Sequence, residues 1–151
     1  MKKSPRIGAN GANAMRVVID TNVITSSLLN PIGVPGQILS LVLDERLEVC
    51  YDARILHEYR EVCLRPPFGQ QPEEVDALID VIKSGGLGVV GAPWPHAGLD
   101  ADDLPFIEVA AASQAQFLIT GNTRHFPRKI GVTRVITPAD FMRIYLAEVR
   151  G

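Results

Sequence analysis

Short β-branched runs of strand length alternate along this chain with segments of helical length. The runs of strand length are Arg16–Asp20 (RVVID), Leu47–Tyr51 (LEVCY), Phe117–Thr120 (FLIT) and Val132–Ile136 (VTRVI), with a weaker one at Leu87–Val90. Strands that alternate with helices indicate a parallel sheet, because each helical crossover returns the chain to the same edge. The pattern therefore predicts an α/β fold in three layers, α/β/α, around a central, mostly parallel sheet.

The helical segments carry their own start and stop signals. Asp52 has the position of an N-cap for a helix that runs to about Leu64, and Pro72, followed by two glutamates, opens the next helix. Pro105 lies in the first turn of a helix that runs to about Ala115. Two more helices are expected, one over Gly36–Leu43 and one that starts near Thr137.

Length and composition favour one globular domain. The chain has 151 residues, of which 46% are apolar, and no apolar run approaches the roughly 18 residues of a membrane span. The Gly/Asn-rich start lacks the apolar centre of a signal peptide, so we expect a disordered extension (residues 1–14) before a single domain (residues 15–151), with Met15 a candidate for the natural start. We therefore expect a cytoplasmic protein with no membrane partner. Two cysteines, Cys50 and Cys63, are too few for a disulfide framework or a zinc site and are predicted to be buried thiols.

The charges are unevenly distributed, although the net charge of −2 is far from that of a strongly basic nucleic-acid coat. The stretch from Val109 to Ala139 contains no Asp or Glu. Its basic residues are Arg124, Arg128, Lys129 and Arg134, and just upstream lie the acids Asp100, Asp102, Asp103 and Glu108. An acidic cluster beside a basic stretch suits a metal site next to a phosphate-binding rim. On charge alone, a mixed solvated surface is the simpler interpretation.

Polar residues follow two of the predicted strands. Asp20 ends the first strand, and Thr21 and Asn22 are expected to continue the turn. Thr120 ends the FLIT strand and is followed closely by Asn122. Parallel α/β sheets bind ligands outside the carboxyl ends of their strands, so these residues are candidates for a site. Each of them alone also fits an ordinary turn that bonds its own backbone.

Further acids lie on the predicted helices. Asp103 stands at a helix start, where Asp is a favoured N-cap, and Asp102 is the alternative cap if Asp103 turns inward. Glu58 flanks the apolar face of a helix and has Glu61 three residues later, a pair that taken alone fits two solvated acids. Glu108 lies about one turn beyond Asp103 and can reach either a site or a salt bridge.

Acids dispersed in this way are what divalent-metal chemistry requires. Mg²⁺ keeps several of its waters and needs only a few carboxylate ligands. Two such ions can activate a water and stabilise the leaving oxygen of a phosphodiester. Converging carboxylates are costly unless a cation neutralises them.

Three segments of the chain, taken in order, resemble the PIN-domain family. The opening strand and first acid of PIN domains are similar to VVIDTNVITSSLL, and the segment of their second acid is similar to ILHEYREVCLRPPF. The third acid, its helix, the next strand and the final turn are similar to LDADDLPFIEVAAASQAQFLITGNTRHFP. The similarity runs from about Arg16 to Leu146. It is greatest to PIN proteins known as toxin components of toxin–antitoxin pairs.

The resemblance implies a PIN-like fold and Mg²⁺- or Mn²⁺-dependent endoribonuclease activity on single-stranded RNA. It implies that Asp20, Glu58 and Asp103 are the catalytic, metal-binding acids, that water activated by the metal is the nucleophile, and that Glu58 helps to orient or deprotonate it. It also implies a cognate antitoxin protein as partner and a homodimer. The supporting polar groups that it implies are Thr21, Asn22 and Thr120.

One position departs from the family pattern. Many PIN nucleases carry a fourth acid in the turn after the last motif strand, but the turn from Thr120 to His125 has none, and Asn122 or His125 stands in its place. An amide oxygen binds Mg²⁺ more weakly than a carboxylate does, so Asn122 is a weak metal ligand. This departure favours the alternative function, a catalytically weak or inactive PIN domain that acts as an RNA- or protein-binding module.

Basic and aromatic residues near this turn are candidates for RNA contact. Arg124, Arg128 and Lys129 are expected to position the RNA backbone. We assign His125 to packing or to a phosphate contact rather than to a metal. Trp94, in a loop between prolines, either stacks on a base or packs on the core.

A phosphotransfer protein with Asp20 or Asp52 as nucleophile is a third, disfavoured class. Aspartate-based phosphatases need a second Asp two positions after the first, and here that position is Asn22. A receiver domain needs paired acids at the end of the first strand, which Ile19-Asp20-Thr21 does not supply. The sequence also has no Gly-rich phosphate loop of the Walker or dinucleotide type.

Overall fold

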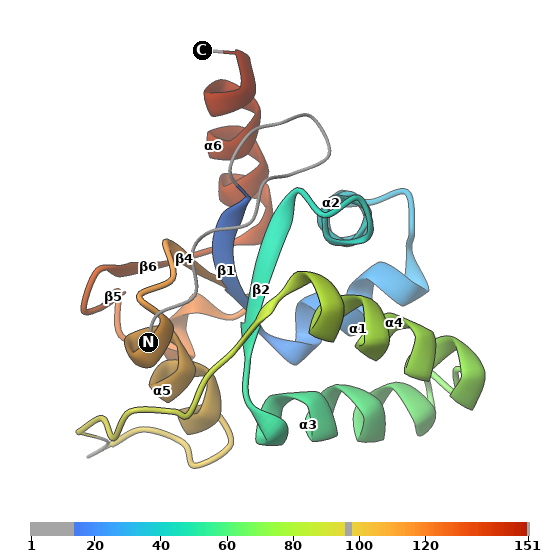
Figure 1. The fold of residues 1–151 in the computed structure, drawn as a ribbon, viewed down its shortest axis with the longest axis horizontal. Helices are drawn as coiled ribbons and strands as arrows, with labels where there is room; N and C mark the ends of the chain where they lie inside the picture. The colour runs from blue at the N-terminus through green and yellow to red at the C-terminus, as the bar shows by residue number, and fades with distance from the viewer. Residues whose placement is uncertain (1–13, 96–97, 151) are drawn as a thin grey trace.

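The structure is a computed structural model that describes residues 14–95 and 98–150. In that part of the chain, six strands form one sheet, and α-helices flank it (Figure 1). The strands are β1 (Met15–Ile19), β2 (Leu47–Tyr51), β3 (Leu87–Gly88), β4 (Phe117–Ile119), β5 (Lys129–Ile130) and β6 (Thr133–Ile136). The helices are α1 (Thr21–Leu29), α2 (Val34–Leu43), α3 (Ala53–Leu64), α4 (Pro72–Gly85), α5 (Leu104–Ser113), α6 (Pro138–Arg150) and the short 3-10 helix η1 (Thr123–His125).

The strand order β3-β2-β1-β4-β6-β5 places β1 and β4 side by side in the middle of the sheet. All pairings are parallel except that of β5 with β6. The chain leaves β1 toward β2 on one side, and later enters β4 on the other side. The carboxyl ends of β1 and β4 therefore flank the point where the strand order reverses, which is where open α/β sheets form their ligand crevice. Because Ile19 pairs with Ile119, Asp20 and Thr120 follow as neighbours.

Helices cover both sides of this sheet. Helix α5 contacts β1, β2 and β4, while α1, α2 and α4 gather on the opposite side (Figure 1). The central strand β1 is buried from Val17 to Ile19, as expected for a parallel strand covered on both faces. The predicted α/β/α fold with a central, mostly parallel sheet is confirmed.

Most predicted elements have the expected bounds. Strand β2 spans the predicted residues, and α3 begins after Asp52, whose side chain accepts a hydrogen bond from the Ile55 N–H at 3.0 Å. The two cysteines, Cys50 and Cys63, are free and buried as predicted, and burial raises the pKa of the Cys50 thiol to about 11. The predicted extension, residues 1–14, lies outside the described residues except for Ala14, which is buried.

One predicted turn is wrong. Thr21 and Asn22 begin helix α1 instead of continuing a turn after Asp20. The β-branched and hydroxyl residues of this segment are poor helix formers, but Val23 and Ile24 are buried in the core, and the Thr25 hydroxyl donates to the Thr21 carbonyl at 3.3 Å. Tertiary packing therefore overrides the weak local propensity.

The helices are short relative to a bilayer. No single helix in the described ranges is long and apolar enough to cross a membrane, and only α1 and α2 together, bent by 103°, reach that length and composition.

Candidate functional site

The site is centred on Asp20, at the carboxyl end of β1. The Thr120 hydroxyl donates a hydrogen bond to Asp20 Oδ2 at 2.7 Å, and the Asp20 N–H donates to the Ile119 carbonyl at 2.9 Å. Asp20 is the N-cap residue of α1, but its side chain makes no capping bond, so the carboxylate is left for other partners. Burial raises the pKa of Asp20, hydrogen bonds from Thr120 and the Thr21 backbone oppose the rise, and the charges of Asp103 and Glu58 add to it.

Helix α3 brings the second acid to this edge. The Thr21 hydroxyl donates a hydrogen bond to Glu58 Oε2, which ties the first turn of α1 to the middle of α3. The next residue, Tyr59, is fully buried, and its hydroxyl donates to the carbonyl of Ile19. Burial, followed by the charges of Asp20 and Glu58, holds the pKa of Tyr59 well above its usual value, so the phenol stays a donor. Tyr59 thus anchors α3 to the end of β1.

The third acid, Asp103, lies at the start of α5. It is the N-cap residue, so the alternative cap Asp102 does not take this position, but the Asp103 side chain makes no capping bond. Burial is the main cause of the raised pKa of Asp103. The charges of Asp100 and Asp102 raise this pKa further, and the nearby His125 lowers it. The side chain is half-buried. Asp103 therefore stands between the acids of its own loop and the imidazole of η1.

The turn after β4 contributes neutral polar groups. The Asn122 N–H donates to Thr120 Oγ1 at 3.0 Å. This bond fixes the position of the hydroxyl that donates to Asp20. The Asn122 side-chain amide lies 3.0 Å from Nδ1 of His125, which is exposed. On the other side of the turn, the Gly121 N–H donates to Asn22 Oδ1 at 3.2 Å. The amide that stands where a fourth acid is expected is thus engaged with His125.

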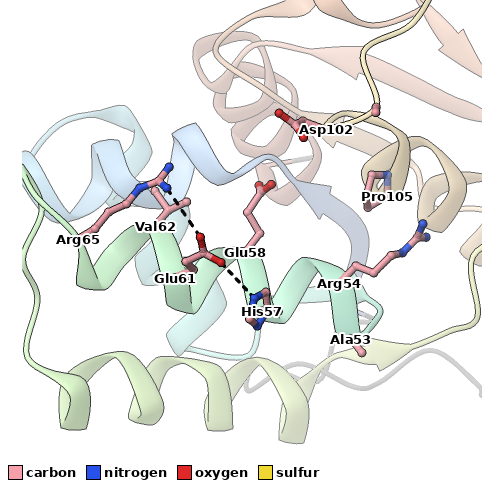
Figure 2. Close-up of a pocket in the computed structure, with 10 residues that line it drawn as sticks. Ala53, Arg54, His57, Glu58, Glu61, Val62, Arg65, Asp102 and Pro105 are labelled. Carbon is pink, nitrogen blue, oxygen red and sulfur yellow. Dashed lines mark ion pairs between the residues drawn. The ribbon is translucent and has the colours of Figure 1, made fainter.

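A cavity of about 640 Å³ opens beside Glu58, between α3 and the start of α5. Figure 2 shows Glu58 pointing across this cavity toward Asp102, while Glu61 turns toward its ion-pair partners. Glu61 lies 3.1 Å from His57 Nε2 and 3.8 Å from an Arg65 nitrogen. Glu61 and His57 therefore belong to the surface of α3.

Several candidate residues lie apart from the acids. Glu108 is bound by Arg54 at 2.8 Å, so of its two expected roles it takes the salt bridge. Arg54 also binds Asp52 at 2.7 Å. The sequence does not signal the pair of Arg54 with Glu108, because 54 positions separate the two residues. Trp94 packs against the core, which favours the packing role over base stacking. The basic candidates Arg124, Arg128 and Lys129 are exposed.

The donor chemistry of the three acids fits a hard divalent cation. Asp20, Glu58 and Asp103 offer oxygen ligands, and the pKa of Asp20 is raised in part by the other two carboxylates, a repulsion that a cation would reverse. Within the described ranges, no three His, Cys, Asp or Glu side chains are close enough to share an ion as they stand. Binding of one ion by all three acids would therefore require their side chains to move closer together.

A family model described as PIN domain matches residues 16–124. The chain belongs to the PIN domain family. An uncharacterized protein of Methanocaldococcus jannaschii is 34% identical over 111 residues, which cover 72% of this chain and 71% of that protein.

Solved structures share the PIN-type fold at low sequence identity. One is VapBC2 from Rickettsia felis bound to a DNA fragment from its promoter, with 14% identity and a TM-score of 0.54. Another is DNA-bound VapBC from Salmonella typhimurium, with 17% identity and a TM-score of 0.54. Each comparison covers 82% of this chain and 98% of the other chain. The resemblance seen in the three sequence segments is thus confirmed at the level of family and fold.

Proposed function

We propose that this PIN domain is an endoribonuclease that hydrolyses single-stranded RNA with Mg²⁺ or Mn²⁺. One observation carries the proposal. Asp20, Glu58 and Asp103 come from β1, α3 and α5, which are distant in sequence, and the charges of the other two acids raise the pKa of Asp20. Carboxylates that repel one another at a sheet switch point are costly to a fold and typical of a functional site.

Each side chain has a role that follows from its contacts. Asp20, Glu58 and Asp103 would hold the ion, which when bound supplies Lewis-acid activation of water and neutralises charge on the leaving oxygen. The Thr120 hydroxyl orients Asp20, and the Thr21 hydroxyl orients Glu58. Glu58 also borders the open cavity, where its second oxygen can accept a proton from an attacking water.

The test is cleavage of an end-labelled single-stranded RNA by the purified protein in Mn²⁺, Mg²⁺ or EDTA. We expect metal-dependent cutting by the wild type and its loss in Asp20→Asn and Asp103→Asn. Asp80→Asn, an exposed acid of α4, is the control for removing one negative charge. Absence of cutting by the wild type, together with no thermal stabilisation by Mn²⁺, would contradict the proposal.

The biological setting that we propose is the toxin of a toxin–antitoxin pair. The resemblance to PIN toxins supports it, and the solved structures of similar fold are VapBC complexes. Expression of the wild type should arrest growth of a bacterial host, and Asp20→Asn should not. Co-expression of the antitoxin encoded next to the gene should restore growth and co-purify. A homodimer and a cytoplasmic location stay predictions, the first testable by analytical ultracentrifugation.

A binding module without catalysis is the second candidate, because Asn122 stands where many PIN nucleases have an acid and is hydrogen bonded to His125. This candidate predicts RNA or protein binding that neither Mn²⁺ nor Asp20→Asn affects. The cleavage assay distinguishes the two functions.

A further inference from the structure

A second hollow lies at the edge of the sheet, away from Glu58. It has a volume of about 690 Å³ and is formed by η1, the β5–β6 edge and the start of α6. Its charged lining residues are Arg124, Arg128, Arg134 and Asp140. We call this hollow the cationic groove. Its volume is within the roughly 300–1,000 Å³ of known ligand sites.

The positive charge of the cationic groove is not neutralised by the protein. In the part of the chain that the structure describes, Arg124, Arg128 and Arg134 form no ion pair with a carboxylate. The one acid of its lining, Asp140, is bound by Arg143 at 3.0 Å. An anion in the groove would supply the missing charge.

Strand pairing adds a fourth cation beside the groove. In the antiparallel pair β5–β6, Lys129 and Arg134 are direct Cα partners, and both are exposed. Like charges directly opposite each other on a sheet are destabilising. The guanidinium of Arg134 is held over the Phe117 ring, 5.8 Å from its centroid, and so keeps its place. The pairing of Lys129 with Arg134 lowers the stability of the sheet, but it places two positive charges where they can bind a polyanion.

The cationic groove adjoins another hollow that reaches Asp103. A smaller hollow of about 430 Å³ is lined by Asp103 and His125, and shares Arg124 and Phe126 with the groove. A strand that extends from Asp103 past His125 would therefore reach Arg124 first, which lines both hollows. Phe126 is buried at 7% exposure, so its ring is not available for stacking on a base. The contacts that the groove offers to a polyanion are therefore those of its three arginines.

We propose that the cationic groove holds the phosphate backbone of single-stranded RNA on one side of the cleavage site. The proposal rests on the proposed nuclease function. It names Arg124, Arg128 and Arg134 as backbone ligands and adds Arg134 to the residues that the sequence indicates. A polynucleotide fits better than an acidic peptide, because its phosphodiester chain can occupy the acid site and the groove at once. Backbone contacts of this kind position a strand without selecting its sequence.

The test measures the salt dependence of binding in EDTA, so that no cleavage is needed. The probe is a 12-nucleotide fluorescein-labelled single-stranded RNA, and binding is followed by anisotropy over a range of salt concentrations. For single strands, log K falls against log salt by about 0.7 for each neutralised phosphate. Removing two contacts in Arg128→Gln/Arg134→Gln should lower the slope by about 1.4 and weaken binding about 25-fold at 0.1 M salt.

Two further variants separate the groove from general charge effects. Arg60→Gln/Lys83→Gln removes the same net charge from exposed positions on α3 and α4 and should leave the slope unchanged. Because Arg134 packs over Phe117, Arg124→Gln/Arg128→Gln provides a second groove variant in which both altered side chains are exposed. Thermal unfolding verifies that all variants are folded.

The outcomes distinguish this inference from the proposed function. Equal slopes for the groove variants and the control variant would overturn the groove assignment, even if the wild type cuts RNA with Mn²⁺. Reduced slopes in a protein that never cuts RNA would support the groove and contradict the nuclease. Tighter binding of a duplex DNA of equal length, with the slope change seen only for that duplex, would overturn the assignment to single-stranded RNA.

Discussion

Thr120 is the position where the stability of the fold and the geometry of the site can be tested together. It is fully buried, and its hydroxyl donates to Asp20 Oδ2 at 2.7 Å and accepts from the Asn122 N–H at 3.0 Å. Thr120→Val keeps the shape of the side chain but removes both bonds, which leaves Asp20 Oδ2 and the Asn122 N–H without this partner. A hydrogen bond to a charged group contributes about 1.5–3 kcal/mol. We therefore expect a loss of about 2 kcal/mol at pH 7, or a fall in Tm of about 4–8 °C for a chain of this size.

The pH dependence of this loss has a defined sign. The Thr120 bond opposes the rise in the pKa of Asp20 that burial causes, so it stabilises the ionised form. The cost of Thr120→Val should be largest where Asp20 is ionised, and should shrink as the pH falls through the raised pKa of this carboxyl. The same bond orients a proposed metal ligand, and loss of such a partner typically lowers metal affinity or activity by about 10–100-fold.

The assay is thermal unfolding at several pH values in EDTA and in a Mn²⁺ series, with RNA cleavage measured in parallel. Thr133→Val is the matched control, since Thr133 is equally buried but its hydroxyl donates at 2.6 Å to a neutral carbonyl, that of Ala115. It should cost about 1 kcal/mol with little pH dependence and unchanged Mn²⁺ affinity. Thr120→Ser keeps the hydroxyl and should retain metal affinity. If Thr120→Val matches Thr133→Val in pH dependence and Mn²⁺ affinity, the reasoning is refuted.

Three further predictions concern buried or missing carboxylates. Asp20→Asn should stabilise the metal-free protein at pH 7. Burial raises the pKa of Asp20 above its usual 3.8, so the wild type loses stability as the pH rises through the raised pKa. Urea unfolding at pH 4 and pH 7 measures the effect, and equal stabilisation at both pH values would contradict the prediction. Glu48→Ala should lower the free energy of unfolding by about 3–5 kcal/mol, because Glu48 is fully buried and bound by Arg16 at 2.6 Å. Chemical unfolding measures this loss, and a value below about 1 kcal/mol would show that the ion pair contributes little to stability. Asn122→Asp should raise Mn²⁺ affinity and cleavage rate while it lowers metal-free stability, as measured by calorimetric titration; unchanged affinity would place residue 122 outside the metal site.

The architecture could be predicted because its signals are local. The run at Leu47–Tyr51, the N-cap Asp52 and the helix-opening Pro72 each act through backbone geometry or a bond within a few residues, and all three lie where expected. Helix α1 could not be predicted in this way. Its residues favour strands or turns, and it forms because Val23 and Ile24 are buried in the core.

The site could be predicted in part. Asp20 and Thr120 were recognisable because parallel strands end at one edge, and the register Ile19–Ile119 places them side by side. The hydrogen bond from Thr21 to Glu58 spans 37 positions and has no local signature. The ion pair of Arg54 with Glu108 has no local signature either.

The sequence by itself determined the family, most of the alternating strands and helices but not α1 or β5, and the set of acids, since periodicity, capping and strand ends depend on near neighbours in the chain. Only the tertiary structure decided which acids lie near Asp20, that Glu108 pairs with Arg54, and that Arg124, Arg128 and Arg134 line one groove. Charge and hydrogen bonding act through space over a few ångströms. Residues far apart in the chain come within a few ångströms of each other only after the sheet and its helices have packed.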